Sequence, residues 1–275
     1  MVCIFRYKYT MGIKKQTKLN LLMRNWPDGQ IKSSVWLNSK GYGANFIQKY
    51  KSNKWIDSIG TGAFKKAGDE VTWDAALDCL QSQLKSEVHV GGKSALELAG
   101  RAQYLKMKET TVVLLSNKKE ALPVWIRKYN WKVKLDYKVK NIFKSNLDFG
   151  EKLNGFTVID TDRASIVVSS PERAYLEYLD DLPKLSSYTE AKEIMENMIS
   201  IRSSMIQHLL ENCTSLKVKR LFLHFAEKVN HPWFKKLNLE KIDLGNGKRV
   251  IFKNGVLDKK YNITVPKDES YYEEV

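Results

Sequence analysis

The residue types best suited to specific recognition gather in one short stretch near the N-terminus. Asn45 and Gln48 carry carboxamides, which can both donate to and accept from the edge of an adenine base, and the lysines around them suit phosphates or guanine. On a helical wheel these polar side chains lie on one face, and Phe46 and Ile47 lie on the other. The pattern indicates a helix that packs with one face and contacts a nucleic acid with the other.

The elements that must position this face follow the order of a winged helix-turn-helix. Apolar side chains at helical spacing predict a first helix over residues 14–26 and a second over residues 31–40, the latter with Ile31 and Val35 turned inward. Gly41-Tyr42-Gly43 then supplies the turn into the third helix.

Behind this helix, residues 55–59 and 63–65 alternate around Gly60-Thr61-Gly62, which predicts a hairpin because glycine tolerates the backbone angles of tight turns. In a winged helix the recognition helix lies in the major groove, and we expect Thr61 at the wing tip to lie against the backbone or the minor groove. The predicted contacts with double-stranded DNA are Lys32, Ser33, Ser34, Asn45, Gln48, Lys49, Lys51, Ser52, Thr61, Lys65 and Lys66.

The charge distribution supports this prediction. The net charge is +15, and residues 1–68 hold 13 Lys and Arg against two Asp, so that +11 lies in a quarter of the chain. The remaining residues are nearly balanced, at +4. A basic front domain attached to a balanced one favours a nucleic-acid reader with a separate second task. The alternative is a basic face kept for solubility alone.

Composition excludes several other classes of protein. Hydrophobic residues make up 43% of the 275 residues, which is typical of a globular chain, and no apolar run is long enough to span a membrane. Three widely spaced cysteines argue against a disulfide framework and for the cytoplasm. Residues 1–10 lack the features of a signal peptide and are expected to be a loose tail, with Met1 and Met11 both open as the start.

A change of charge sign at Gly68-Asp69-Glu70 marks the expected boundary between a winged helix-turn-helix at 11–68 and a mixed α/β domain at 69–267. The fold class is therefore α+β, with the second domain ending in a helical segment and a hairpin. Subdomains at 69–183 and 184–267 and an acidic tail at 268–275 are also expected. Within the second domain the pattern predicts strands at 88–90, 110–115, 156–160 and 164–170, helices at 171–182, 187–198, 200–212 and 216–229, and a hairpin within 242–252.

Two short motifs in the second domain could hold a ligand. Gly92-Lys93-Ser94 resembles the end of a phosphate-binding loop, but Glu87 occupies the place of the first glycine, so a close-packed turn is favoured. Asp160 and Asp162 would share one face of a strand and could hold a metal ion. A polar turn is the favoured interpretation, because no third carboxylate lies close in the sequence.

A third feature is the basic side of the helix at 216–229. Lys217, Lys219 and Arg220, with His224, lie opposite the apolar face and are expected to be exposed. A solvated face is the commoner explanation, and a second DNA contact or a partner surface is the alternative. Histidines and cysteines show no zinc spacing, and no dinucleotide-binding or nucleophile motif occurs, so we predict no metal, no cofactor and no enzyme.

Taken together, the motifs resemble the AbiEi antitoxins of type IV toxin-antitoxin systems. The likeness spans residues 12–267 and is carried by GYGANFIQKY, WIDSIGTGAFKKAGD, HVGGKSALEL, SSPERAYLE, VKRLFLHFAEK, HPWFKKL, IDLGNGKRVIF and YNITVP, in family order. The resemblance implies a bacterial repressor whose winged helix binds inverted repeats in the promoter of its own operon. It also implies a C-terminal domain that opposes a neighbouring nucleotidyltransferase toxin without a stable complex. The resemblance supplies no catalytic residues, and a toxin-binding module or a nucleic-acid-processing enzyme remains the alternative for the second domain.

Overall fold

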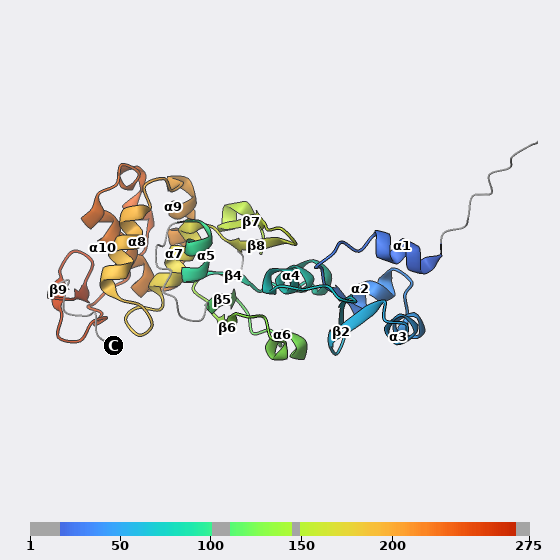
Figure 1. Ribbon diagram of the computed structural model, residues 1–275. Helices are drawn as coiled ribbons and strands as arrows, with labels where there is room; N and C mark the ends of the chain where they lie inside the picture. Colours follow the sequence, from blue (N-terminus) through green and yellow to red (C-terminus); the bar gives the residue numbers. More distant parts are fainter. Residues whose placement is uncertain (1–16, 101–110, 145–148, 268–275) are drawn as a thin grey trace, which may run out of the picture.

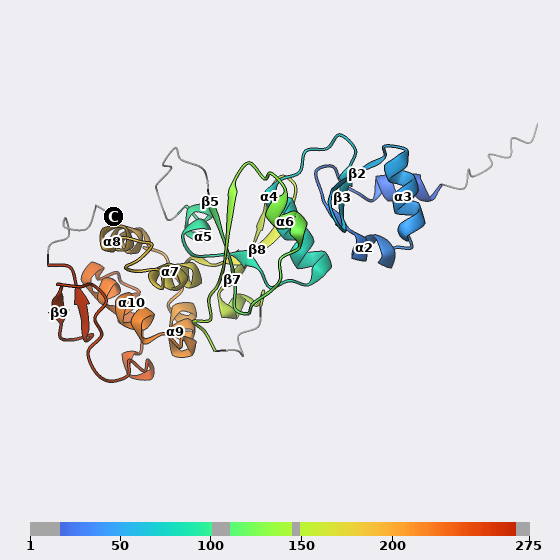
Figure 2. The same cartoon turned by 90° about the horizontal axis from the view of Figure 1, so that it is seen from below.

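The computed structural model describes residues 17–100, 111–144 and 149–267 and shows an elongated molecule (Figure 1). The winged region lies at one end, a mixed sheet lies in the middle, and a group of helices with a small hairpin forms the other end (Figures 1 and 2). The expected tails at 1–10 and 268–275, and Met11, lie outside the described residues. No helix in the described ranges is long and apolar enough to cross a membrane.

The N-terminal region has the order of a winged helix-turn-helix, as the sequence predicts. Its three strands pair antiparallel in the order β1-β3-β2. The elements are α1 (Lys18–Arg24), β1 (Lys32–Ser33), α2 (Ser34–Ser39), α3 (Ala44–Ser52), β2 (Ile56–Gly60) and β3 (Ala63–Lys66).

The second helix begins later than predicted. Lys32 and Ser33 pair with β3 as a short strand, and the Ser33 hydroxyl accepts a hydrogen bond from the Trp36 amide at 3.1 Å, which caps α2. Because the helix starts at Ser34, Val35 faces outward and is 57% exposed, so its predicted inward position is wrong. Ile31 is buried as predicted.

The second domain is built on a five-stranded mixed sheet in the order β6-β5-β4-β8-β7. The β5/β6 and β4/β8 pairs are parallel, and the β4/β5 and β7/β8 pairs are antiparallel. The strands are β4 (His89–Val90), β5 (Thr111–Ser116), β6 (Lys134–Val139), β7 (Phe156–Asp160) and β8 (Ser165–Ser169), and the helices that accompany them are α4 (Trp73–Asp78), a π-helix (Cys79–Gln83), α5 (Gly92–Leu98) and α6 (Val124–Lys128).

Four helices follow the sheet, and their positions agree well with the predicted ranges. They are α7 (Pro171–Leu179), α8 (Tyr188–Asn197), α9 (Ser203–Asn212) and α10 (Leu216–Val229). Every residue of α7 from Glu172 to Leu179 is buried, because the helix packs against α5, α9 and α10. Short 3-10 turns occur at Lys152–Asn154, Phe234–Lys236 and Leu239–Lys241, and the terminal hairpin consists of β9 (Val256–Asp258) and β10 (Ile263–Val265).

The hairpin predicted within residues 242–252 is wrong. The terminal hairpin lies further along the chain, and residues 242–252 form an irregular loop over α10. Gly245 and Gly247 have positive φ angles of 60° and 78°, which bend the loop so that its carbonyl groups point towards Arg220.

The hydrophobic side chains form two cores. A small core within the winged region includes Leu22, Trp26 and Leu37, and the large core runs through the second domain. Ile59 and Ala63 belong to the large core although they lie in the wing. Apolar contacts therefore cross the expected boundary after residue 68, and the placement of that boundary remains a prediction.

The π-helix joins the two regions through glutamine side chains. The Gln83 carboxamide accepts a hydrogen bond from the Ser33 amide and donates to the Ile31 carbonyl, both at 2.8 Å. Gln81 pairs in the same way with Val167, whose amide donates to it at 2.8 Å and whose carbonyl accepts from it at 2.9 Å. The π-helix thus hydrogen-bonds to a strand on each side.

Candidate nucleic-acid interface

The outward face of α3 is held in place by aromatic packing beneath it. Ile47 and Tyr50 are buried, and the ring centroids of Phe46 and Tyr50 lie 6.0 Å apart. Because this apolar side is anchored, the opposite side must face outward. The exposed side chains on α3 include five of the predicted contacts, namely Asn45, Gln48, Lys49, Lys51 and Ser52.

This face has the chemistry that base and phosphate contacts need. Helix α3 contains no acidic residue, so no carboxylate within it competes with phosphate for Lys49 and Lys51. The Ser52 hydroxyl donates to the Gln48 carbonyl at 2.7 Å, which ties it to its own helix. The carboxamides of Asn45 and Gln48 are exposed on the same helix as the lysines.

Two of the predicted contacts, Lys32 and Ser33, lie inside the structure instead. They are 9% and 1% exposed, because the β1 strand they form is covered on one side by the π-helix. The Lys32 ammonium donates to the Gln30 side chain at 2.7 Å and lies 4.7 Å from the centre of the Trp36 ring. Burial lowers the pKa of Lys32. Neither side chain is presented to a ligand, and Ser34 is only half-exposed.

The wing is packed against the second domain. An added Cβ atom at Gly60 would lie 2.6 Å from the Cβ atom of Trp125 in α6, so the turn and α6 are in close contact. Thr61 remains exposed. Lys65 donates to the Asp69 carbonyl, and the Lys66 ammonium lies 2.6 Å from the Asp28 carboxylate. The wing lysines are therefore engaged by their own chain.

The basic side of α10 is buried, which corrects the expectation of an exposed face. Lys219 and Arg220 are 4% and 2% exposed. The Lys219 ammonium donates to the Asp243 carbonyl at 2.7 Å, and Lys217 donates to the carbonyls of Asp180 and Leu182 at 2.6 and 3.0 Å. These cations satisfy backbone oxygens of neighbouring segments, so they do not offer a surface to DNA.

Arg220 makes the most extensive of these contacts. Its guanidinium donates to the carbonyls of Leu244 and Gly247 at 2.8 and 2.7 Å. It also donates to those of Gly245 and Asn262 at 3.1 and 3.2 Å. The loop at 242–252 is therefore wrapped around one buried cation.

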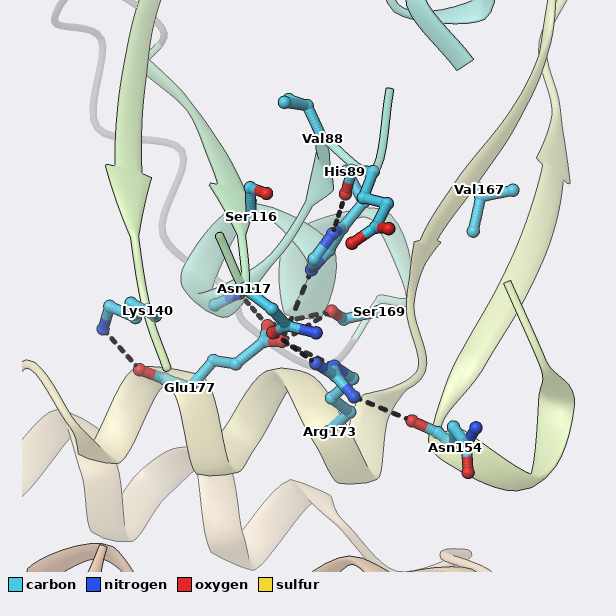
Figure 3. Close-up of polar contacts among 12 residues, drawn as sticks. Val88, His89, Ser116, Asn117, Lys140, Asn154, Val167, Ser169, Arg173 and Glu177 are labelled. Carbon is cyan, nitrogen blue, oxygen red and sulfur yellow. Dashed lines mark hydrogen bonds and ion pairs between the residues drawn. The ribbon is translucent and has the colours of Figure 1, made fainter. Parts of the chain in front are cut away.

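A buried polar cluster that the sequence pattern did not predict lies at the centre of the second domain (Figure 3). The Glu177 carboxylate accepts hydrogen bonds from Arg173 Nε at 2.8 Å, the Ser169 hydroxyl at 2.9 Å and the Gly92 amide at 3.0 Å. Burial alone would raise the pKa of Glu177, but the neighbouring His89 and the Arg173 charge lower it to about 2.

Arg173 links this cluster to the segments that follow β5 and precede β7. It donates to the Asn154 carbonyl at 2.9 Å and to the Asn117 side chain at 3.0 Å, and it lies 4.2 Å from the ring centres of both Phe143 and Phe156. The spacing of Arg173 and Glu177, four residues apart on one helix, is a sequence feature that indicates their ion pair. The hydrogen-bond partners of Arg173 and Glu177 come from the chain itself, and the cluster fixes α7 to the sheet.

The residues of the Gly92-Lys93-Ser94 motif also contact groups of the chain itself. The Gly92 amide donates to Glu177, and an added Cβ atom at Gly91 would lie 2.6 Å from that carboxylate. Lys93 forms an ion pair with Glu190 at 2.6 Å, and the Ser94 hydroxyl accepts from the β5 backbone at 3.0 Å. An internal carboxylate thus occupies the place that a phosphate would take, which supports the close-packed turn.

Asp160 and Asp162 lie at the exposed end of the β7–β8 hairpin. Within the part of the chain that the structure describes, no group of three or more His, Cys, Asp or Glu residues is arranged as a metal site. Thr161 between them bonds to Asp74 and Ala164, which fixes the turn. The polar-turn interpretation is supported.

Comparison with known proteins adds two matches to protein families. Residues 15–107 match the family described as "Transcriptional regulator, AbiEi antitoxin N-terminal domain", and residues 109–266 match "Transcriptional regulator, AbiEi antitoxin, Type IV TA system". None of the curated proteins matches the chain at a significant level.

Among solved structures, the crystal structure of the RV2827C protein from Mycobacterium tuberculosis resembles this fold. It has a TM-score of 0.55 at 11% sequence identity, over 89% of this chain and 88% of that one. At this identity the likeness concerns the fold alone.

Proposed function

Because the chain belongs to the AbiEi family of antitoxins and transcriptional regulators of type IV toxin-antitoxin systems, we propose that it represses its own operon by binding inverted repeats in the promoter. Helix α3 is the recognition element: Asn45 and Gln48 read bases, and Lys49 and Lys51 hold phosphates. The observation that carries the proposal is the outward face of α3, which is polar, basic and anchored from below by Ile47 and Tyr50.

The proposal is tested by replacing residues on this face. We expect Gln48→Ala/Lys49→Ala to weaken binding to a duplex from the upstream promoter and to reduce its salt dependence. The double variant Asn246→Ala/Lys248→Ala is the matched control, since it removes one amide and one positive charge from exposed positions in the second domain. Equal affinities for the wild type and the α3 variant would contradict the assignment of α3.

The second half of the proposal concerns the toxin. We propose that the C-terminal domain counteracts a nucleotidyltransferase toxin encoded beside it, in the cytoplasm and without a cofactor. If DNA binding and antitoxicity lie in different domains, the α3 variant should still restore growth to cells that express the toxin. If the α3 variant is present at the wild-type level and does not restore growth, antitoxicity depends on DNA binding.

Direct binding of the toxin and nucleic-acid processing are the alternatives for the second domain. Stable co-purification of the two proteins would favour the first alternative. Turnover of nucleic acid that depends on added metal and is lost in Asp160→Asn would favour the second.

A further inference from the structure

We propose that the second domain binds a free nucleotide in an open hollow between α6 and β6. The hollow has a volume of about 640 Å³ and is lined by α6, by the segment before it and by the chain from Tyr129 to Tyr137. Figure 1 shows α6 and β6 in the middle of the molecule. A small molecule in this place would be bound whether or not the protein also binds DNA.

The size and the fixed walls of the hollow suit a small organic molecule. Pockets that hold ligands and cofactors commonly measure about 300–1,000 Å³ and are largely formed before the ligand binds. Here the Trp131 indole donates to the Ile126 carbonyl at 2.7 Å, which ties the segment after α6 to the helix. The Glu120 amide donates to the Tyr137 hydroxyl at 3.0 Å, which ties the segment before α6 to β6. The hollow therefore has a defined shape in the free protein.

Much of the lining is aromatic or aliphatic. Tyr129 and Trp131 line it with ring centroids 4.6 Å apart, and Leu122, Leu135 and Tyr137 line it as well. Both tyrosines pack against the large core but are only half-buried. Aromatic side chains stack on planar rings, and this kind of contact holds nucleic-acid bases without strong preference for one base. A planar heterocycle can thus cover apolar surface that the chain leaves partly exposed.

The polar part of the lining offers hydrogen-bond donors. Arg127 and Lys134 both line the hollow and are exposed, and no hydrogen bond or ion pair joins either to another described residue. The Tyr137 oxygen accepts from the Glu120 amide, so its own hydrogen can still be donated to a ligand. A guanidinium contacts a phosphate through two parallel hydrogen bonds. This combination of donors favours a ligand that carries a phosphate.

Glu120 is the single acidic residue of the lining, and its carboxylate is engaged elsewhere. It accepts from the hydroxyls of Ser86 and Ser116 at 2.6 and 3.1 Å and from the Glu87 amide at 3.0 Å. It therefore does not neutralise Arg127, and the hollow does not suit a cation. A ligand that joins a planar ring to a phosphate uses both parts of the lining. A nucleotide has this structure, whereas an aromatic carboxylate is smaller and has a weaker anionic group for two cations.

Calorimetric titration of the full-length protein tests the class of ligand. The probes are AMP, GMP, CMP and UMP, together with adenosine, inorganic phosphate and benzoate. We expect a mononucleotide to bind roughly tenfold or more tightly than adenosine or phosphate, because each of these reaches only one part of the lining. Benzoate should also bind more weakly than the nucleotide.

The site itself is tested by comparing Arg127→Ala with Lys128→Ala. Each variant removes one exposed positive charge from α6, but only Arg127 lines the hollow. We expect Arg127→Ala to weaken nucleotide binding roughly tenfold to a hundredfold, because the hydrogen bonds to a charged phosphate are lost. Arg127→Lys, which keeps the charge but not the paired donors, should give an intermediate affinity. Lys128→Ala should bind as the wild type does.

A third variant, Ala121→Trp, fills the hollow without removing a polar group. Ala121 is exposed and lines the hollow, so the larger side chain should block the nucleotide and leave the unfolding temperature unchanged. Nucleotide binding that persists in Ala121→Trp would overturn the inference, as would equal losses in Arg127→Ala and Lys128→Ala. Failure of every mononucleotide to bind the wild type, or equal affinity for benzoate or phosphate, would reject the proposed class of ligand. Thermal unfolding of each variant shows whether the fold is retained.

Discussion

Helices α3 and α10 both carry several basic residues opposite an apolar face, yet these residues differ in their exposure to solvent. Lys49 and Lys51 on α3 are exposed, whereas Lys219 and Arg220 on α10 are buried. The difference comes from what packs over each helix. A glycine-bent loop covers α10 and offers its carbonyl oxygens, whereas within the described residues nothing covers the outer face of α3.

A basic stripe on a helix does not by itself define a binding surface. A buried guanidinium is stable when several carbonyl groups accept its hydrogen bonds, so arginine can organise a loop as well as a ligand. On α10 the cations hold the protein together. On α3 they are exposed.

Replacing Arg220 tests whether the cations of α10 stabilise the fold. We expect Arg220→Ala to lower the free energy of unfolding by about 3–5 kcal/mol, because four carbonyl groups lose their donor and a cavity forms over α10. Urea titration followed by circular dichroism measures the change. Lys248→Ala, at an exposed position of the same loop, should stay within about 0.5 kcal/mol of the wild type. A stable Arg220→Ala protein with weakened DNA binding would reverse the assignment of this face.

The buried cluster at Glu177 gives a second, smaller effect with a defined pH dependence. The pKa of Glu177 is lowered from 4.5 to about 2 in the folded state. The ionised carboxylate therefore stabilises the folded protein fully at pH values above the pKa of the unfolded state. That contribution, about 3 kcal/mol, is lost as the pH falls from about 5 towards 2.

The measurement is the unfolding free energy at several pH values for the wild type and Glu177→Gln. The variant should have a lower free energy of unfolding at neutral pH. Its free energy of unfolding should fall less than that of the wild type as the solution is made acidic. Ser169→Ala removes one of the donors to the carboxylate and should give an intermediate curve. Parallel curves for the wild type and Glu177→Gln would show that the ionised carboxylate does not stabilise the fold.

The features that the sequence could predict are those set by local pattern. The bounds of α10 coincide with the predicted range, and α8, α9 and the β7–β8 hairpin lie within a few residues of theirs. Periodicity and turn residues determine such elements over short distances. The order of the winged helix follows from the same signals.

The missed features depend on contacts between distant segments. Arg220 is bound by carbonyls 24 to 42 residues away, and Trp125 covers a wing turn that lies about 65 residues earlier in the chain. A helical wheel assigns a face to each residue but does not show what packs over it. The exposed face of α3 was predicted because its apolar anchors, Ile47 and Tyr50, lie within the same helix.

The smallest expected change in the free energy of unfolding is that of Lys51→Ala, on α3. Because its side chain is exposed in the free protein, Lys51→Ala should leave the free energy of unfolding within about 0.5 kcal/mol of the wild type. If Lys51 holds one phosphate, the same substitution should weaken binding to promoter and random duplexes alike and reduce the salt slope by roughly one.

Gln48→Ala separates base reading from phosphate binding on the same helix. If Gln48 contacts a base edge, its loss should lower discrimination between promoter and random duplex by about 1–3 kcal/mol and leave the salt slope unchanged. Titrations of both duplexes at several salt concentrations measure the two quantities. An altered salt slope without loss of discrimination would assign Gln48 to the backbone. In that case, base reading on α3 would depend on Asn45, the other exposed carboxamide of the predicted set.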